Sequence, residues 1–288
     1  MSITTHKIFF GDAKSVLQKY VADESVQLMV TSPPYWNVRD YAHPLQIGYN
    51  DTIEEYLDKL DEVWREVIRV LLPDGKLALN IGNIYYSEPK EKRRTTANLT
   101  LLAWDRLNKF KELKFMGTIY WKKTTSREGA VLFGSYPYPS NFMISNATEP
   151  IFVFRKVGER KVSKEIKERS KISLEDFRAF RDAIWPINGA ASDKHTAAFP
   201  VEIPRRLIMM YSFVEDIILD PFAGSATTTK AAIDLGRNSV GIEIQPDFLE
   251  YMREKLSINE HHQAFKEISK AKIEVCYSET GKQKVYHI

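Results

Sequence analysis

Apolar residues recur along the chain with two periodicities, which predict alternating helices and strands. The helical period is clearest after Thr52, where nine apolar positions between Ile53 and Leu71 fall on one broad face. Thr52, with Glu55 three residues later, forms a capping box at the start of this helix. The same patterns predict further helices at 13–20, 98–110, 204–211 and 247–256, and strands at 7–12, 25–31, 76–81, 115–121, 149–155, 217–220, 239–244 and 273–277.

The polar stretches between these elements predict loops. Residues 37–51 and 122–148 hold turn residues with aromatic residues among them, residues 85–97 predict a mobile charged loop, and residues 185–200 are loop-like. In contrast, the nearly continuous apolar run at 76–81 is expected of a strand that is buried on both faces of a parallel sheet.

The overall composition changes this picture little. The chain has 288 residues, enough to bury a real core, and its net charge of +3 does not by itself indicate nucleic-acid binding. Its single cysteine, Cys276, excludes an internal disulfide and a cysteine-rich metal site. No apolar run approaches the roughly 20 residues that cross a bilayer, and the N-terminus has no signal-peptide pattern, so a cytoplasmic protein is expected.

Positive charge is concentrated in residues 155–182. This stretch carries ten Lys or Arg residues against six Asp or Glu residues, and Ser173 with Asp176 predicts a short helix within it. Because phosphates dominate the affinity of proteins for DNA, a basic and locally helical insertion suits contacts with DNA. A solvated helical face is the competing interpretation, and composition does not decide between the two.

Residues 30–36 (VTSPPYW) end the strand at 25–31 abruptly. Neither proline has an N–H and both have a fixed φ, so the backbone there is stiff. The Ser32 hydroxyl, a carbonyl of Ser32 or Pro33, and the Tyr35 ring are thereby held at the mouth of a sheet. The two oxygens can accept N–H bonds from an exocyclic amino group while the ring stacks on a flat base. Taken alone, the stretch also fits a proline-rich turn with a core tyrosine.

A second informative stretch, residues 217–229 (IILDPFAGSATTT), combines an apolar strand ending in Asp220, a turn with Gly224 and a helix start. The next strand ends near Glu243, and an acid about 20 residues after such a turn can hold both ribose hydroxyls. The turn has one glycine where a dinucleotide fingerprint has three, so a nucleoside without phosphates fits better. The alternative is a plain turn between a strand and a helix.

Two further residues have more than one interpretation. Asp12 ends the first strand, where acids meet ligands in open α/β sheets, and it equally fits a helix N-cap. His195 alone is typical of a structural or solvated histidine. No second His or Cys lies at metal-ligand spacing, so no metal is expected.

Residues 31–36 (TSPPYW) resemble the catalytic motif of amino-group DNA methyltransferases. Residues 220–225 (DPFAGS) with Thr227 resemble the S-adenosylmethionine (AdoMet) loop of these enzymes, and residues 241–243 (GIE) resemble their ribose-binding motif. The catalytic motif precedes the AdoMet loop, which is the order of the β class, and residues 195–200 (HTAAFP) lie just upstream of that loop. Ala226 departs from the family, which usually has a second glycine there.

This resemblance implies a Rossmann-like AdoMet-dependent methyltransferase fold with circularly permuted motifs, in which helices cover both faces of a mostly parallel, seven-stranded α/β sheet. It divides the chain into a catalytic half (1–154), a target-recognition insertion (155–184), an AdoMet-binding half of the same domain (185–256) and a C-terminal extension (257–288). It assigns catalysis to Ser32, Pro33, Pro34 and Tyr35. It assigns AdoMet binding to Asp12, Thr31, His195, Phe199, Asp220, Phe222, Gly224, Ser225, Thr227 and Glu243.

The implied activity is site-specific methylation of double-stranded DNA, in which a base is flipped out of the duplex and its exocyclic amino group receives the methyl group of AdoMet. In the family, Ser at the position of Ser32 usually accompanies methylation at N4 of cytosine, so that product is expected, with N6 of adenine as the alternative. Two other classes stay open: an AdoMet enzyme acting on RNA or protein glutamine, whose AdoMet loop generally comes first, and an inactive DNA-binding relative. A homodimer and a cognate restriction endonuclease also stay open as partners, and no membrane is expected.

Overall fold

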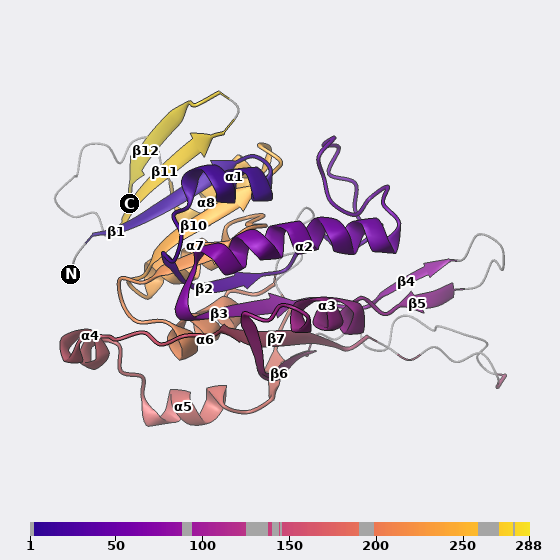
Figure 1. Ribbon diagram of the computed structural model, residues 1–288, viewed down its shortest axis with the longest axis horizontal. Coiled ribbons are helices and arrows are strands. Elements are labelled where there is room, and N and C mark those ends of the chain that lie inside the picture. The colour runs from indigo at the N-terminus through magenta and orange to yellow at the C-terminus, as the bar shows by residue number, and fades with distance from the viewer. Residues whose placement is uncertain are drawn as a thin grey trace.

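The computed structural model describes residues 3–87, 94–124, 138–139, 144, 146–189, 199–258, 271–278 and 280–288. In these residues ten strands form one sheet (Figure 1): β1 (Thr4–Phe10), β2 (Val26–Thr31), β3 (Leu71–Asn80), β6 (Leu113–Lys123), β7 (Thr148–Lys156), β8 (Ile184–Ile187), β9 (Ile217–Asp220), β10 (Asn238–Glu243), β11 (Ala271–Tyr277) and β12 (Gln283–His287). The strand order is β12-β11-β1-β10-β9-β2-β3-β7-β6-β8.

The sheet is mostly parallel, as the sequence predicts. From β11 through β1, β10, β9 and β2 to β3, each strand runs parallel to its neighbour, and β8 is parallel to β6. The antiparallel pairs are β12 with β11, and β7 with both β3 and β6. All residues of β2 are buried, as expected of a central strand that is covered on both faces.

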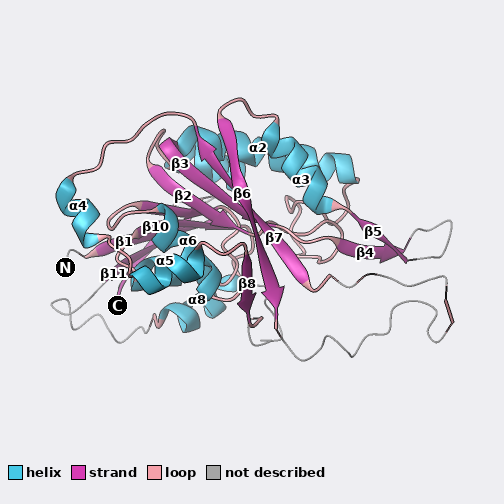
Figure 2. Cartoon of the chain, turned by 90° about the horizontal axis from the view of Figure 1, so that it is seen from below, coloured by secondary structure: helices cyan, strands magenta, loops and turns pink. Residues whose placement is uncertain are grey.

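Helices cover both faces of this sheet, with α2 and α3 on one side and α5, α6 and α8 on the other (Figure 2). The helices in the described residues are α1 (Ala13–Tyr20), α2 (Ile53–Val70), α3 (Leu99–Asn108), α4 (Lys164–Arg169), α5 (Leu174–Phe180), α6 (Glu202–Tyr211), α7 (Thr227–Asp234) and α8 (Phe248–Leu256). On β2, Met29 packs into the core beneath α1 and α2, whereas Leu28 and Val30 pack into the core beneath α6 and α7. Successive side chains of the strand point to opposite faces of the sheet, so alternate residues of β2 pack into two different cores.

The predicted capping box begins α2. The Thr52 hydroxyl accepts a hydrogen bond from the Glu55 backbone N–H at 3.2 Å, and the Glu55 carboxylate accepts one from the Thr52 N–H at 2.8 Å. The apolar face of this helix is buried, including Trp64 at its centre. None of the helices in the described ranges is long and apolar enough to cross a membrane.

The expected number of seven strands was wrong. In the described residues β8 extends one edge of the sheet, and β11 with β12 extends the other. The prediction of a loop from 185 onward missed β8, in which Trp185 and Ile187 are buried on one face and Pro186 lies between them. Pro186 is tolerated because β8 is an edge strand, where a missing N–H costs no ladder hydrogen bond.

The loop predicted at 85–97 was also wrong at both ends. There β4 (Ile84–Ser87) and β5 (Arg94–Ala97) pair as an antiparallel hairpin, and residues 88–93 between them lie outside the described part. The charges within 85–97 suggested a loop, but Tyr85 and Tyr86 against Thr95 and Thr96 are residues that favour cross-strand pairs.

Candidate active site

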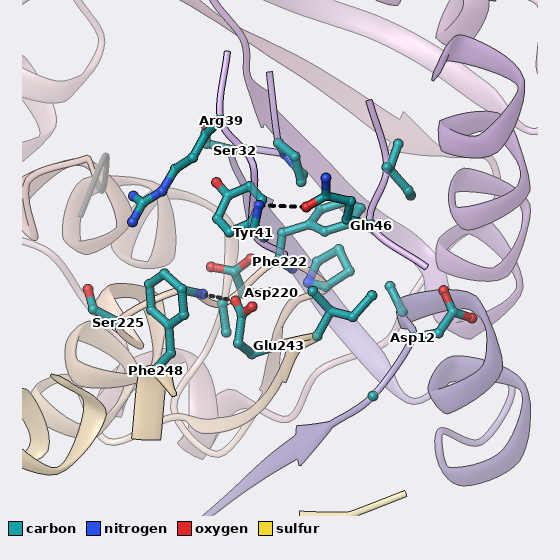
Figure 3. Close-up of a pocket in the computed structure, with 18 of the residues that line it drawn as sticks. Asp12, Ser32, Arg39, Tyr41, Gln46, Asp220, Phe222, Ser225, Glu243 and Phe248 are labelled. Atoms are coloured by element: carbon teal, nitrogen blue, oxygen red, sulfur yellow. Dashed lines mark hydrogen bonds between the residues drawn. The ribbon is translucent and has the colours of Figure 1, made fainter. Parts of the chain in front are cut away.

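The carboxyl ends of β1, β2, β9 and β10 surround one cavity (Figure 3). Parallel neighbours end at the same edge of a sheet, so the segments that follow these strands converge there. Ser32 and Phe222 bring both sequence motifs to the cavity wall, although the motifs lie about 190 positions apart in the chain. The predicted site residues that line the cavity are Asp12, Ser32, Pro34, Phe199, Asp220, Phe222, Gly224, Ser225, Thr227 and Glu243.

Asp220 ties the two motifs together. One of its carboxylate oxygens accepts hydrogen bonds from the Thr31 hydroxyl at 2.6 Å and the Phe222 N–H at 3.1 Å, and the other accepts from the Thr228 hydroxyl at 2.7 Å. Burial raises the pKa of Asp220 to about 6, and these three donors oppose the rise. Thr31 is fully buried and does not line the cavity, so its contact with the site runs through Asp220.

Glu243, at the end of β10, accepts two backbone hydrogen bonds, from Gly224 at 2.8 Å and from Gln245 at 2.9 Å. Burial raises the pKa of this carboxyl to about 7, and the two N–H donors oppose the rise. Each carboxylate oxygen keeps a second lone pair. Glu243 can therefore accept hydroxyl donors from a ligand in the cavity while it holds the turn between β9 and α7 in place.

That turn contains two residues with left-handed backbone. Gly224 has φ +51°, and Ala226 has φ +63° and ψ +35° directly before α7. A residue with a Cβ in this conformation costs roughly 1 to 2 kcal/mol, which glycine avoids. This geometry gives a physical reason for the family's usual second glycine. Ala226 adopts the same left-handed backbone with the smallest side chain that has a Cβ, in a fully buried position.

A lysine that the sequence analysis did not select stands behind this turn. The Lys255 ammonium, on α8, donates to the hydroxyls of Ser225 and Thr227, the second at 2.8 Å. Both residues are buried and line the cavity. Because an ammonium only donates, both hydroxyl oxygens act as acceptors toward Lys255, which leaves the hydroxyls able to donate to an anionic group. The two hydroxyl oxygens also lie 3.5 Å apart, within hydrogen-bond distance of each other.

The proline-containing motif is anchored from α2. Tyr56 is fully buried and its hydroxyl donates to the Pro34 carbonyl at 2.9 Å, so this carbonyl is engaged within the protein. Pro33 is buried and does not line the cavity. Tyr35 is half-buried, packs against the core beneath α2 and does not line the cavity.

Residues 39–47 cover the cavity opposite the strand ends. The Gln245 side chain donates to the Tyr41 carbonyl at 2.7 Å. The Tyr41 N–H donates to the Gln46 side chain at 2.6 Å (Figure 3). The Arg39 guanidinium lies 5.2 Å from the centre of the Tyr41 ring and 6.0 Å from that of Phe248, which are cation–π distances. The turn residues at 37–51 predict a loop here, but they carry no signal that the loop closes a binding site.

Asp12 and His195 are the two predicted site residues with more than one interpretation. Asp12 lines the cavity and is also the N-cap of α1, where it accepts the Ser15 N–H at 2.9 Å, so both interpretations fit its position. His195 lies outside the described residues. Within the described part of the chain, no group of three or more His, Cys, Asp or Glu side chains could hold a metal ion.

A family model described as DNA methylase matches residues 26–254. The chain belongs to this DNA methylase family. Type II methyltransferase M.MjaI of Methanocaldococcus jannaschii is 35% identical over 289 residues, an alignment that covers 89% of this chain and 93% of that protein.

Solved structures show the same relationship. TTHA0409 of Thermus thermophilus, in complex with S-adenosyl-L-methionine, matches this DNA methylase with a TM-score of 0.71 and 35% identity, over 88% of this chain and 95% of that one. The PvuII DNA methyltransferase (cytosine-N4-specific) matches with a TM-score of 0.67 over 90% of this chain and 89% of that one. Its 19% identity shows a common fold alone.

Proposed function

We propose that this DNA methylase transfers the methyl group of AdoMet to N4 of a cytosine that is flipped out of double-stranded DNA. The observation that carries the proposal is the single cavity shared by Ser32 and Pro34 on one side and Phe222 and Glu243 on the other. A methyl donor and an amino group must meet within a few ångströms for direct transfer, and most of the acceleration then comes from positioning.

The polar and apolar groups around the cavity suit AdoMet. Glu243 would accept the ribose hydroxyls, Phe222 offers an apolar surface, and Asp12 offers a carboxylate at the end of β1. The hydroxyls of Ser225 and Thr227, backed by Lys255, would donate to the methionine carboxylate. Bound AdoMet supplies a methyl group on a sulfonium. We include Thr31, His195, Phe199, Asp220 and Gly224 in the same proposed AdoMet site.

On the opposite side, the residues of the proline motif would hold the target base. Ser32 Oγ and the Pro33 carbonyl would accept the two amino N–H bonds, Tyr35 would stack on the ring, and Pro34 would form the wall between base and AdoMet. Accepting both N–H bonds directs the nitrogen lone pair toward the sulfonium methyl and stabilises the positive charge that develops on nitrogen. A new C–N bond would form as the bond between the methyl carbon and sulfur breaks, and S-adenosylhomocysteine would leave with that electron pair. The methylated nitrogen would then lose one N–H proton to water, so the transfer needs no covalent adduct on the base.

We propose that residues 155–184 contact the target DNA. They include α4 and α5, whose side chains are largely exposed and which begin at the capping residues Ser163 and Ser173. The excess of Lys and Arg over Asp and Glu in residues 155–182 gives this stretch a positive charge, which complements the negative charge of DNA phosphates. In the same proposal, residues 1–154 and 185–256 are the catalytic and AdoMet-binding halves of one domain, and 257–288 is an extension.

Incubation with duplex DNA and AdoMet carrying a labelled methyl group should yield N4-methylcytosine on nucleoside mass spectrometry. Ser32→Ala should lower the rate about 100-fold, because one acceptor for the amino group is lost, and it should leave AdoMet binding intact. Recovery of 6-methyladenine alone would replace cytosine with the alternative target. A Ser32→Ala rate equal to wild type would contradict the role of Ser32.

AdoMet affinity should depend on the ionisation of Glu243. Hydrogen bonds from ribose hydroxyls favour the carboxylate, so AdoMet binding should lower a pKa that stands at about 7 in the free protein. AdoMet binding then releases protons. The affinity for AdoMet should be greatest above that pKa and should decrease as the pH falls through it, by about 3- to 10-fold at pH 6. Calorimetry at pH 6 and pH 8 in two buffers of different ionisation enthalpy measures both effects. Glu243→Gln should flatten the profile, and a wild-type affinity equal at both pH values would contradict the expectation.

A further inference from the structure

A chain of hydrogen bonds leads away from Ser32 to two charged residues on neighbouring strands. The Ser32 hydroxyl donates to Tyr35 Oη at 3.3 Å, and Tyr35 Oη donates to Glu149 Oε2 at 3.1 Å. The other oxygen, Glu149 Oε1, accepts from the ammonium of Lys123 in an ion pair. Glu149 lies on β7 and Lys123 ends β6, so these two residues come from outside both sequence motifs.

The surroundings hold this chain in place. Glu149 is largely buried, with 13% of its side chain exposed. Gly82 leaves room for it, because a Cβ at that position would meet the Glu149 side chain at 3.1 to 3.3 Å. Burial, followed by the nearby Glu149 charge, raises the pKa of Tyr35 well above its usual value, so the phenol keeps the proton that it donates.

The hydrogen bonds of this network can run in only one direction. An ionised carboxylate only accepts and an ammonium only donates, so Lys123 and Glu149 together oblige Tyr35 to donate toward Glu149. Tyr35 Oη in turn accepts the hydrogen bond that the Ser32 hydroxyl donates. The Ser32 hydroxyl hydrogen therefore points away from the cavity, and its lone pairs are left for a ligand.

We propose that Glu149, held by Lys123, is a positioning residue that makes Ser32 Oγ a pure acceptor toward the target amino group. This inference rests on the proposed function of Ser32 and deepens it. An amino group offers only N–H donors to its neighbours while its lone pair attacks the methyl group. A Ser32 hydroxyl that donated into the cavity would compete for that lone pair and oppose the transfer.

Glu149→Gln tests the direction of the chain with almost no change in shape. Lys123 attracts the amide oxygen, which turns the amide NH₂ toward Tyr35 Oη. Tyr35 then donates to Ser32, and Ser32 donates into the cavity. The single-turnover methylation rate at saturating AdoMet and DNA should fall about 30-fold, while the AdoMet dissociation constant and the thermal midpoint stay close to wild type.

The double variant Lys123→Met/Glu149→Gln distinguishes this role from simple packing. Without the ammonium, the amide oxygen is free to face Tyr35 and restore the original direction. The double variant should therefore be faster than Glu149→Gln, with Lys123→Met measured alongside to complete the cycle. A Glu149→Gln rate within twofold of wild type, or a double variant as slow as Glu149→Gln, would overturn the inference. Absence of amino methylation by the wild-type protein would overturn the proposed function and this inference with it.

Discussion

Replacing Glu243 with alanine should reduce AdoMet affinity at least 100-fold. The proposed site gives this carboxylate two ribose hydroxyls, and hydrogen bonds to a charged acceptor contribute about 1.5 to 3 kcal/mol each. The same substitution removes the acceptor for the Gly224 and Gln245 N–H groups, which shape the turn around the cavity. Equilibrium titration with AdoMet, by calorimetry or by quenching of tryptophan fluorescence, measures the loss.

Glu250→Ala is the matched control for this prediction. Glu250 lies on α8 with 84% of its side chain exposed and makes only a long surface ion pair at 3.8 Å, so its loss should leave affinity unchanged. Glu243→Gln keeps one carbonyl acceptor and should fall between alanine and wild type. An affinity of Glu243→Ala within threefold of wild type would show that AdoMet is held elsewhere.

Trp64→Ala should destabilise the fold by about 3 to 5 kcal/mol, the usual cost of removing a large aromatic side chain from a core. Trp64 is about 1% exposed and lies at the centre of α2. Its ring meets that of Phe222 edge to face, with 6.2 Å between the ring centres. The cavity wall therefore rests directly on the core beneath α2. Thermal unfolding should show a midpoint lower by roughly 10 °C.

Leu101→Ala is the control for the stability measurement. Leu101 lies on α3 and is 62% exposed, so its truncation should change stability by less than about 0.5 kcal/mol. A midpoint shift below about 2 °C for Trp64→Ala would contradict the role assigned to this ring. Such a small shift would mean that the core repacks fully around the gap, so that the position of Phe222 does not depend on Trp64.

The sequence was most informative where chemistry and periodicity coincide. The broad apolar face after Thr52 gave α2 almost to the residue, and the apolar strands that end in Asp220 and Glu243 gave the sheet edge where the cavity lies. Local composition is sufficient at such places because ligands of open α/β sheets bind at the carboxyl ends of the strands, where these acids lie.

Residues that act from a distance left no comparable signal. Lys255 lies in an ordinary amphipathic helix, and Glu149 lies near the start of a strand whose centre, residues 151–154, is buried on both faces. Their importance comes from the side chains that tertiary packing brings to them, at separations of 30 positions for Ser225 and 114 for Tyr35. Spacing rules that span one helical turn or one strand cannot detect such pairs.

The short edge elements were missed for a different reason. β8, β4 and β5 have only four residues each, too few to show a period, and β8 contains a proline. β12 has five residues, of which Tyr286 is buried, and it pairs only with β11. In such strands partners from elsewhere in the chain, rather than the local sequence, decide the conformation.

The place of β1 between β10 and β11 has a consequence for how the protein is made. A ribosome releases β1 before both of its neighbours in the sheet, which follow residue 237. A growing chain therefore carries β1 with two open edges until β10 and β11 have emerged, and such long-range pairing is slow. The half of the cavity built by β9 and β10 is therefore completed late in synthesis, and a partly made chain has the wall that carries Ser32 and Pro34 without the wall that carries Asp220 and Glu243.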